Sequence, residues 1–274
     1  MYCFLNGEIL PEQAASLHLN DLALLRGYGI FDYFLFERFQ PRFLEDYLDR
    51  FFRSAALLRL QCPVDREGMR QGIHRVIAAN EVQEGGIRLV LTGGYSHDSY
   101  TPTEGNVFIL QAPIPRVKEE LFQRGARAAL YQHQRELPMV KSLNYLTGIH
   151  ILPWLAAQDA EFVVYHDGTF LRESDRSNFF IVDANGHLLT PADKVLAGVT
   201  RKHIIAAAHE LGIPVEEREV AVAELDTAAE AFITSSIKGA LAVSSMDGKP
   251  IGNGKPGPIT QRLQQAFLEK VAIH

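Results

Sequence analysis

The sequence contains few of the features that mark secreted, metal-binding or membrane proteins. Its 274 residues include only two cysteines, Cys3 and Cys62, which are too few and too isolated for a disulfide framework or a metal cluster. No uninterrupted apolar run reaches the length of a transmembrane helix, and the start of the chain lacks the basic segment of a signal peptide. We therefore expect a soluble, cytoplasmic protein without a bound metal.

Basic charge is also scarce. The formal net charge is −6, so the chain has no broad basic field of the kind that nucleic-acid binding requires. A hydrophobic content of 47% and a charged content of 22% are ordinary for a soluble globular protein. These values favour small molecules as partners and argue against nucleic acid or a membrane.

The residue pattern divides the chain into two domains of mixed α/β (α+β) structure. Residues 1–115 combine short apolar strands with two amphipathic helical stretches, at 44–60 and 65–80, and predict a small N-terminal domain. Prolines then mark the start of a linker, which we place at 116–125, because proline stiffens the chain and donates nothing to a sheet. A larger C-terminal domain is expected at 126–274.

Lys141 is the most informative residue, because of its setting in Val140-Lys141-Ser142-Leu143-Asn144-Tyr145-Leu146. A lysine forms a Schiff base with an aldehyde only when its amine is neutral, and the apolar residues around Lys141 help to desolvate it. Tyr145 lies four positions later and reaches the same pocket if a helical turn begins here. Taken singly, a surface lysine and a core tyrosine are the alternative interpretations.

Glu173 is a candidate partner for a pyridine nitrogen. It lies between an apolar strand and the small polar run 174–178. A carboxylate that faces the ring nitrogen keeps the ring protonated, which strengthens it as an electron sink. An exposed loop glutamate is the alternative interpretation.

Two later segments are candidate phosphate sites. Gly198-Val199-Thr200 precedes a helical pattern that runs to Leu211, and backbone N–H groups at a helix start bind anions. Thr200 as a plain N-cap of that helix is the alternative. Thr234-Ser235-Ser236 follows an apolar run and is either a second phosphate cup or an ordinary turn. Together with Lys141 and Glu173, these segments supply the groups that pyridoxal phosphate needs.

From end to end, the chain resembles the class IV (fold-type IV) pyridoxal-phosphate aminotransferases. That family includes branched-chain aminotransferases, D-amino acid aminotransferases and aminodeoxychorismate lyase. Besides the segments above, similar motifs occur at Gly27-Tyr28-Gly29-Ile30-Phe31-Asp32, in the helix Leu44 to Phe51, and in the run 252–258. The resemblance implies a two-domain fold, pyridoxal 5'-phosphate as cofactor, amino acids and 2-oxo acids as substrates, and a homodimer.

The resemblance also implies roles for individual residues. Lys141 would bind the cofactor aldehyde and move a proton between substrate and cofactor, Glu173 would pair with the ring nitrogen, and Tyr145 with the phenolic oxygen. Two positions depart from the family pattern: Tyr47 stands where many relatives have histidine, and Ser174-Asp175-Arg176 replaces a commoner Gly-Ser-Ser. The full set of implied cofactor-binding residues is Arg50, Lys141, Tyr145, Glu173, Asn178, Val199, Thr200, Ser235 and Ser236.

Two arginines are candidates for holding the substrate carboxylate, because a guanidinium matches two carboxylate oxygens. Arg26 precedes Gly27, and Arg88 lies in an apolar strand where alternation places it on the same face as Val90. A structural salt bridge is the alternative for Arg88. The arginine pair resembles a non-canonical subset of D-amino acid transaminases, which implies D-alanine, D-glutamate and 2-oxoglutarate as substrates.

Three alternatives remain open at this point. The first is transamination of L-branched-chain amino acids, with an apolar substrate pocket formed by Phe31, Tyr33, Phe34 and Tyr95. The second is aminodeoxychorismate lyase, and the third is a non-catalytic protein that binds pyridoxal phosphate. Retention of both Lys141 and Glu173 argues against the third, because binding alone does not need an electron sink. In a homodimer, Arg26 could serve the neighbouring subunit.

Overall fold

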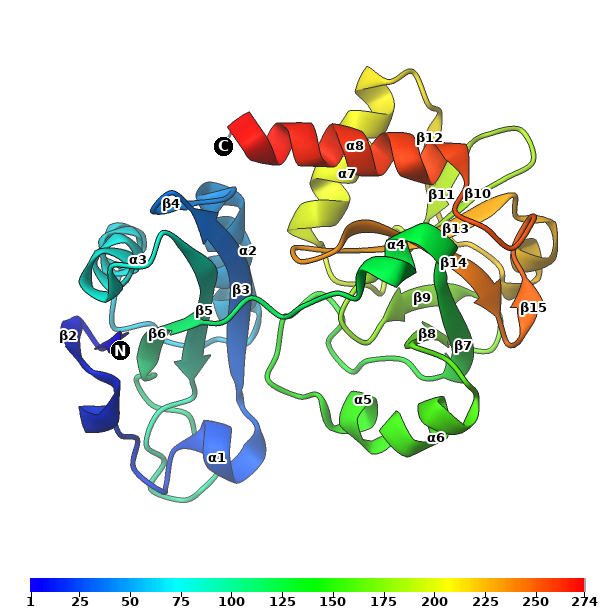
Figure 1. Cartoon of the computed structure of the whole chain (residues 1–274). Coiled ribbons are helices and arrows are strands. Elements are labelled where there is room, and N and C mark those ends of the chain that lie inside the picture. Colours follow the sequence, from blue (N-terminus) through cyan, green and yellow to red (C-terminus); the bar gives the residue numbers. More distant parts are fainter. Residues whose placement is uncertain (274) are drawn as a thin grey trace. The chain divides into compact units, whose positions relative to one another are not determined.

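The computed structural model describes residues 1–273, which form two compact units (Figure 1). Unit 1 consists of Met1–Pro115 and Val140–Asn144, and unit 2 consists of Arg116–Met139 and Tyr145–Ile273. The first boundary between the units follows Pro115. Two features differ from the expected domains: helix α4 (Glu119–Arg124) occupies the expected linker, and the segment that carries Lys141 returns to unit 1. His274, the last residue of the expected C-terminal domain, lies outside the described residues.

Unit 1 is built on an antiparallel six-stranded sheet in the order β2-β1-β6-β5-β3-β4. Asn6 and Gly7 form its first hairpin turn, both with the positive φ (49° and 106°) that such turns require. The strands are β1 (Tyr2–Leu5), β2 (Glu8–Pro11), β3 (Gly29–Glu37), β4 (Gln40–Pro41), β5 (Glu84–Thr92) and β6 (Val107–Ala112).

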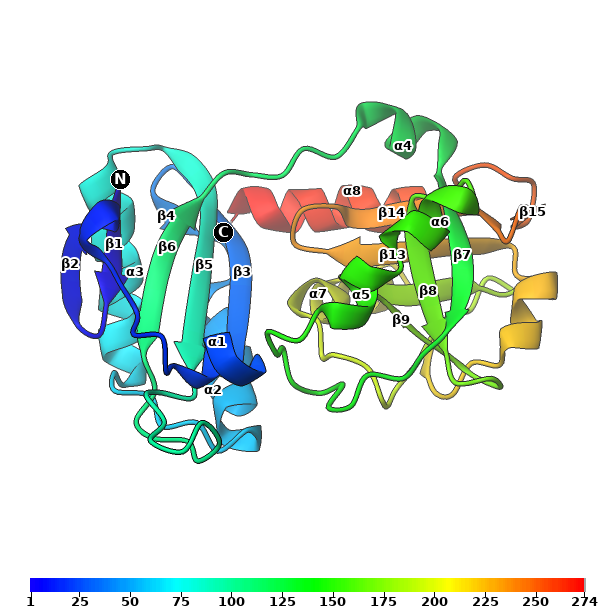
Figure 2. The ribbon, with the colours of Figure 1, turned by 90° about the horizontal axis from the view of Figure 1, so that it is seen from below.

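Helices α2 (Leu44–Leu57) and α3 (Arg66–Asn80) cover one face of this sheet (Figure 2). Phe34 of β3 stacks on Tyr47 of α2 with ring centroids 4.9 Å apart. On α3, Gly72 lies so close to Phe4 and Ile109 that a Cβ atom would come within 3.0 Å of both. Alternate strand residues therefore form the core beneath the helices. Two short helical segments complete unit 1, η1 (Glu12–Ala14) and α1 (Leu22–Arg26).

Unit 2 contains a mixed nine-stranded sheet in the order β12-β11-β10-β13-β14-β7-β8-β9, with β15 paired to β14. Its core includes Phe162, Leu171, Phe179, Ile233 and Leu241. The strands are β7 (Ala126–Gln132), β8 (Phe162–His166), β9 (Leu171–Ser174), β10 (Asn178–Val182), β11 (Leu188–Thr190), β12 (Val215–Glu217), β13 (Glu230–Ser235), β14 (Gly239–Met246) and β15 (Lys249–Pro250).

The remaining helices of unit 2 are α5 (Leu146–His150), α6 (Leu152–Ala157), α7 (Val199–Glu210), η2 (Val222–Thr227) and α8 (Pro258–Ile273). Helices α7 and α8 pack against each other (Figure 1). The Glu230 carboxylate fixes the start of α8 by accepting hydrogen bonds from Ile259 N (2.9 Å) and Thr260 N (2.8 Å). Within residues 1–273, no helix combines the length and the apolar character that crossing a bilayer requires.

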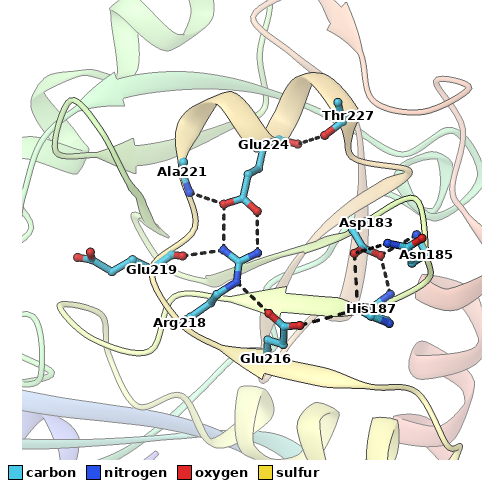
Figure 3. A network of polar contacts seen from close by, with 9 residues as sticks. All are labelled: Asp183, Asn185, His187, Glu216, Arg218, Glu219, Ala221, Glu224 and Thr227. Carbon is cyan, nitrogen blue, oxygen red and sulfur yellow. Dashed lines mark hydrogen bonds and ion pairs between the residues drawn. The ribbon is translucent and has the colours of Figure 1, made fainter.

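A surface ion-pair network joins β12 to η2 (Figure 3). Arg218 donates to both carboxylate oxygens of Glu224 (2.9 and 2.7 Å) and to Glu216 (3.0 Å). Glu224 also accepts from the backbone N–H of Ala221 at 2.7 Å, so it closes the first turn of η2. Because these side chains are partly exposed, each pair contributes at most about 1 kcal/mol. The network contains no predicted site residue and stabilises the periphery of unit 2.

Candidate functional site

Lys141 lies on an extended segment that pairs with the edge of β3. Phe31 N donates to Lys141 O at 3.0 Å, and Leu143 N donates to Gly29 O at 3.0 Å. Lys141 N donates in turn to Ser54 Oγ of α2 at 3.3 Å. These hydrogen bonds form an isolated antiparallel bridge between Ser142 and Ile30 and fix the backbone on either side of the lysine.

The Lys141 amine lies on the face of the sheet opposite α2 and α3. Its Nζ is 4.7 Å from the centroid of the Phe31 ring. Residues paired across adjacent strands point to the same side, and side chains two positions apart share a face, so Tyr33 is on this side too. Arg88 of β5 pairs directly with Tyr33. Unit 1 therefore brings Lys141 together with three of the predicted substrate residues, Phe31, Tyr33 and Arg88.

Arg88 is exposed, and it forms no ion pair with any residue in the described part of the chain. Burial raises the pKa of its neighbour Tyr33, and the positive charge of Arg88 opposes that rise. The Tyr33 ring lies over Gly86, where a Cβ atom would come within 2.1 Å of the hydroxyl, and Tyr33 donates to Pro113 O at 3.2 Å. The guanidinium thus has the properties expected of a ligand-binding group rather than of a structural salt bridge.

Phe34 does not belong to this face. It alternates with Phe31 and Tyr33, and it is fully buried beneath α2. The expectation that Phe34 lines an apolar pocket with Phe31, Tyr33 and Tyr95 is therefore wrong, because strand alternation sends Phe34 into the core. Val90, which pairs with Phe31, occupies the open face instead.

Arg26 ends α1, a helix of five residues whose start is capped by Asp21. Its side chain is exposed, and Nη1 donates to Leu25 O at 2.8 Å. No contact among residues 1–273 brings it to Lys141 or Arg88. The structure of one chain therefore does not unite the two predicted carboxylate-binding arginines.

Arg50 on α2 forms a buried, bidentate ion pair with Asp32 of β3. Nε donates to Oδ2 at 2.9 Å and Nη2 donates to Oδ1 at 2.6 Å. The guanidinium also lies 5.1 Å from the centroid of the Tyr47 ring, at the position that departs from the family pattern. Asp32, which sequence reasoning did not select, thus orients the arginine proposed for the phosphate.

Glu173, on β9, is the central residue of the candidate site in unit 2. Its buried carboxylate accepts hydrogen bonds from Arg135 Nη1 (2.8 Å) at one oxygen, and from Leu196 N (2.9 Å) and Asn178 Nδ2 (3.5 Å) at the other. Donors on both oxygens, one of them cationic, hold the carboxylate in a fixed orientation. Such a carboxylate is suited to accept a hydrogen bond from a protonated ring nitrogen.

Asn178 connects Glu173 to the start of α7. Its Nδ2 donates to Leu196 O at 2.7 Å, and a Cβ atom at residue 198 would lie 2.0 Å from its Oδ1. Only glycine permits this close approach at Gly198. The two contacts hold the beginning of α7 beside the Glu173 carboxylate.

The start of α7 differs in one detail from the expectation. Gly198 is the N-cap residue, with φ −67° and ψ 135°, and Thr200 lies inside the first turn, so the N-cap interpretation of Thr200 is wrong. The first intrahelical bond runs from Lys202 N to Gly198 O at 3.0 Å. The N–H groups of Val199 and Thr200 precede that bond and point out of the helix end, as an anion site requires.

The end of β13 adds hydroxyl groups to the same region. Thr234 pairs with Asn178 across β10 and β13. Its Oγ1 is buried and has no hydrogen-bond partner among residues 1–273. Because an unpaired buried hydroxyl costs free energy, this group is suited to a polar ligand. Ser235 Oγ and Ser236 follow, and Lys238 Nζ donates to Ser235 Oγ at 3.3 Å.

Tyr145 lies in the surroundings of Glu173. It is the N-cap residue of α5, which begins at Leu146, and residues 141–144 are not helical, so the helical turn expected to relate Tyr145 to Lys141 is wrong. Burial raises the pKa of Tyr145 to about 12, with Arg135 lowering it and Glu173 and Asp175 raising it. The phenol therefore stays protonated at neutral pH and can donate a hydrogen bond to a ligand oxygen.

These residues fit pyridoxal phosphate. The fit is supported by the unpartnered Thr234 hydroxyl, by the close approach at Gly198, and by the N–H groups that begin α7. Unit 2 alone combines an oriented carboxylate, a buried phenol and an anion-binding helix end. Sequence reasoning missed Arg135, Leu196, Asp32 and Lys238, because each acts through a partner that is remote in the sequence.

Comparison with known proteins gives a consistent result. The family model for class IV aminotransferases matches residues 29–246. The D-alanine aminotransferase of Listeria monocytogenes is 30% identical over 283 residues, covering 99% of this chain and 96% of that protein. A putative branched-chain-amino-acid aminotransferase of Methanocaldococcus jannaschii is 32% identical over 281 residues, covering 98% and 96%.

Among solved structures, the Escherichia coli branched-chain amino acid aminotransferase superposes with a TM-score of 0.91 at 25% sequence identity, covering 98% of this chain and 94% of that one. This similarity confirms the expected α/β architecture of fold type IV. Enzymes of this family act with pyridoxal 5'-phosphate, which is therefore the cofactor of this protein. The chain belongs to the class IV aminotransferases.

Proposed function

We propose that the protein transfers an amino group between a D-amino acid, such as D-alanine or D-glutamate, and a 2-oxo acid, such as 2-oxoglutarate. The main support is the grouping of Lys141 with Tyr33 and the unpaired, exposed Arg88 on one face of unit 1. A guanidinium so placed can bind a substrate carboxylate through two parallel hydrogen bonds. Similarity to D-alanine aminotransferase over almost the whole chain agrees with this substrate class.

Lys141 is the residue that we assign to the chemistry. Pyridoxal phosphate supplies an aldehyde that reacts with amines and a ring that delocalises negative charge. Lys141 would hold the aldehyde through its amine, and the same amine would serve as the general base or acid for the proton at substrate Cα. The Phe31 ring lies 4.7 Å from Nζ and so forms one wall beside the amine.

The unit 2 residues hold the cofactor. Glu173, oriented by Arg135, would accept the hydrogen bond of the ring nitrogen, and the protonated Tyr145 would donate to the phenolic oxygen. Asn178 keeps the Glu173 carboxylate and the start of α7 in register. The family resemblance adds Arg50 of unit 1 to Val199, Thr200, Ser235 and Ser236 as the residues that would bind the phosphate, through side chains or backbone N–H groups.

Transamination of L-branched-chain amino acids is the second candidate. Phe31, Tyr33 and Val90 share one face of the sheet and offer an apolar surface to a branched side chain. The Methanocaldococcus jannaschii relative and the Escherichia coli structure both carry branched-chain names. We rank this candidate second because the exposed Arg88 adds a charged group to the same face, from which an aliphatic side chain gains nothing.

We also propose that the protein is a homodimer. Leu146, Ile149 and Leu152 on α5 and α6 are 75%, 65% and 51% exposed, which is unusual for neighbouring leucine and isoleucine residues. A second copy of the chain would cover such a surface. Light scattering after gel filtration should give a mass of about 61 kDa, twice the 30.6 kDa of one chain. A mass of one chain at micromolar concentration would refute the dimer.

Two measurements on the protein loaded with pyridoxal phosphate test the function. Borohydride reduction followed by peptide mass spectrometry should find the cofactor attached to Lys141. Steady-state assays with 2-oxoglutarate as acceptor should then give a kcat/KM for D-alanine at least about tenfold above that for L-leucine. The reverse preference would establish the branched-chain alternative, and modification of a lysine other than Lys141 would overturn the site.

A further inference from the structure

Lys238 is a buried lysine in the turn between β13 and β14. Its side chain is only 9% exposed. Nζ donates to Ser177 Oγ and to Ser235 Oγ, each at 3.3 Å, and lies 5.1 Å from the centroid of the Phe162 ring. No carboxylate in residues 1–273 forms an ion pair with it. Its contacts within residues 1–273 are with two hydroxyl groups and an aromatic ring, so the ammonium has no counter-ion there.

This arrangement is unfavourable unless an anion binds. A lysine is rarely buried in a protein without a carboxylate partner, because removal of the charge from water is costly. Burial accordingly lowers the pKa of Lys238 to about 8; Arg176 lowers it further, and Asp175 raises it. An ammonium has three N–H donors, of which the two serines accept two. The third donor is suited to a ligand.

The position of the ammonium connects it with the cofactor-binding residues of unit 2. Ser177 directly precedes Asn178, and Ser235 directly follows Thr234. Asn178 and Thr234 are register partners, and the Thr234 hydroxyl is the buried group that has no hydrogen-bond partner. Lys238 therefore lies at the ends of β10 and β13, beside residues of the candidate cofactor site.

We propose that Lys238, Ser177 and Ser235 form a binding site for a carboxylate group of the amino acid or 2-oxo acid substrate. The ammonium supplies the charge and a hydrogen bond, and the serine hydroxyls orient the ammonium and can turn to donate to a carboxylate oxygen. The inference rests on the proposed transaminase function, which supplies a ligand with one or two carboxylates. It identifies a cation of unit 2 that determines substrate choice.

Lys238→Met tests the site, and Lys249→Met, at an exposed lysine of the same unit, is the matched control. Binding of glutarate, an unreactive dicarboxylate, and of propionate is measured by calorimetry on the cofactor-loaded proteins. Loss of a charged hydrogen bond should weaken glutarate binding about tenfold or more in Lys238→Met, with less than about a twofold change in the control. Weaker binding of glutarate alone assigns the site to the distal carboxylate of a dicarboxylic substrate. Weaker binding of both ligands assigns it to the carboxylate that all substrates share.

Two outcomes would overturn the proposal. Unchanged glutarate and propionate binding in Lys238→Met would show that the amine is structural. Weaker affinity for pyridoxal phosphate with unchanged glutarate binding would assign Lys238 to the cofactor phosphate. If Lys238→Met does not fold, Ser177→Ala should weaken glutarate binding about threefold or more by the loss of a neutral hydrogen bond. Turnover of D-amino acids by the wild type is measured in parallel. Absence of that turnover would mean that the proposed function is wrong, whereas normal turnover with unchanged ligand binding in Lys238→Met would mean that only this site is wrong.

Discussion

Replacing Lys238 by methionine should stabilise the folded protein at pH 7. Burial lowers the pKa of Lys238 from its ordinary 10.5 to about 8. A difference of that size corresponds to about 3 kcal/mol of unfavourable free energy for the charged form in the folded protein. Methionine keeps the unbranched shape and removes the charge, but Ser177 and Ser235 each lose a partner, at about 1 kcal/mol or less each. The expected net gain is therefore about 1–3 kcal/mol.

The difference in unfolding free energy between Lys238→Met and the wild type should depend on pH. In the unfolded chain, Lys238 stays protonated up to about pH 10.5, whereas in the folded protein it loses its proton above about pH 8. Between these values the unfolded state binds more protons, so the free energy of unfolding of the wild type rises with pH. The advantage of Lys238→Met should be complete below about pH 8 and should disappear towards pH 10.5.

Denaturant unfolding at pH 7 and pH 10 measures the effect, with Lys249→Met as the control. The control should differ from the wild type by no more than about 0.5 kcal/mol at either pH, because Lys249 is exposed. Lower stability of Lys238→Met at pH 7 would show that the buried ammonium has a compensating anion within the chain. A stability difference that is the same at both pH values would refute the titration argument.

Three further predictions concern the site. Lys141→Ala should abolish turnover and the borohydride-trapped adduct while circular dichroism stays unchanged, because an amine at a sheet edge contributes little packing; turnover near the wild-type rate would contradict its role. Arg88→Met should raise the KM for amino acids about tenfold or more and leave cofactor affinity unchanged, since a guanidinium–carboxylate pair is lost; an unaltered KM for every substrate would argue against it. Gly198→Ala should lower cofactor affinity and destabilise the protein by about 1–3 kcal/mol, because its Cβ would lie 2.0 Å from Asn178 Oδ1. Gly148→Ala, where no atom lies closer than 3.5 Å, is the control, and equal effects of the two substitutions would refute the steric argument.

Local signals in the sequence were sufficient for much of the fold. Strand alternation correctly placed Arg88 on the face of Val90, and apolar periodicity located α2 and α3 to within a few residues. The motif at 198–200 predicted a helix start, although the N-cap fell on Gly198 rather than Thr200. That shift has a tertiary cause, because Asn178 packs against the glycine.

Long-range pairs were not predictable from the sequence. Arg135 meets Glu173 across 38 positions, Arg50 meets Asp32 across 18, and Lys238 meets Ser177 across 61. Each partner is a charged or hydroxyl residue of a type that occurs throughout the chain, so spacing alone does not distinguish it. These contacts arise only once the sheets have formed, and they set the orientation of the groups that the motifs identified.

The central claim is that the site acts on D-amino acids through Lys141. It is tested most directly by the visible absorption of the protein loaded with pyridoxal phosphate, titrated separately with D-alanine, D-glutamate and L-leucine. We predict that the band of the lysine-bound cofactor disappears with the two D-amino acids and persists with L-leucine. Loss of the band with L-leucine alone, or with none of the three, would contradict the claim.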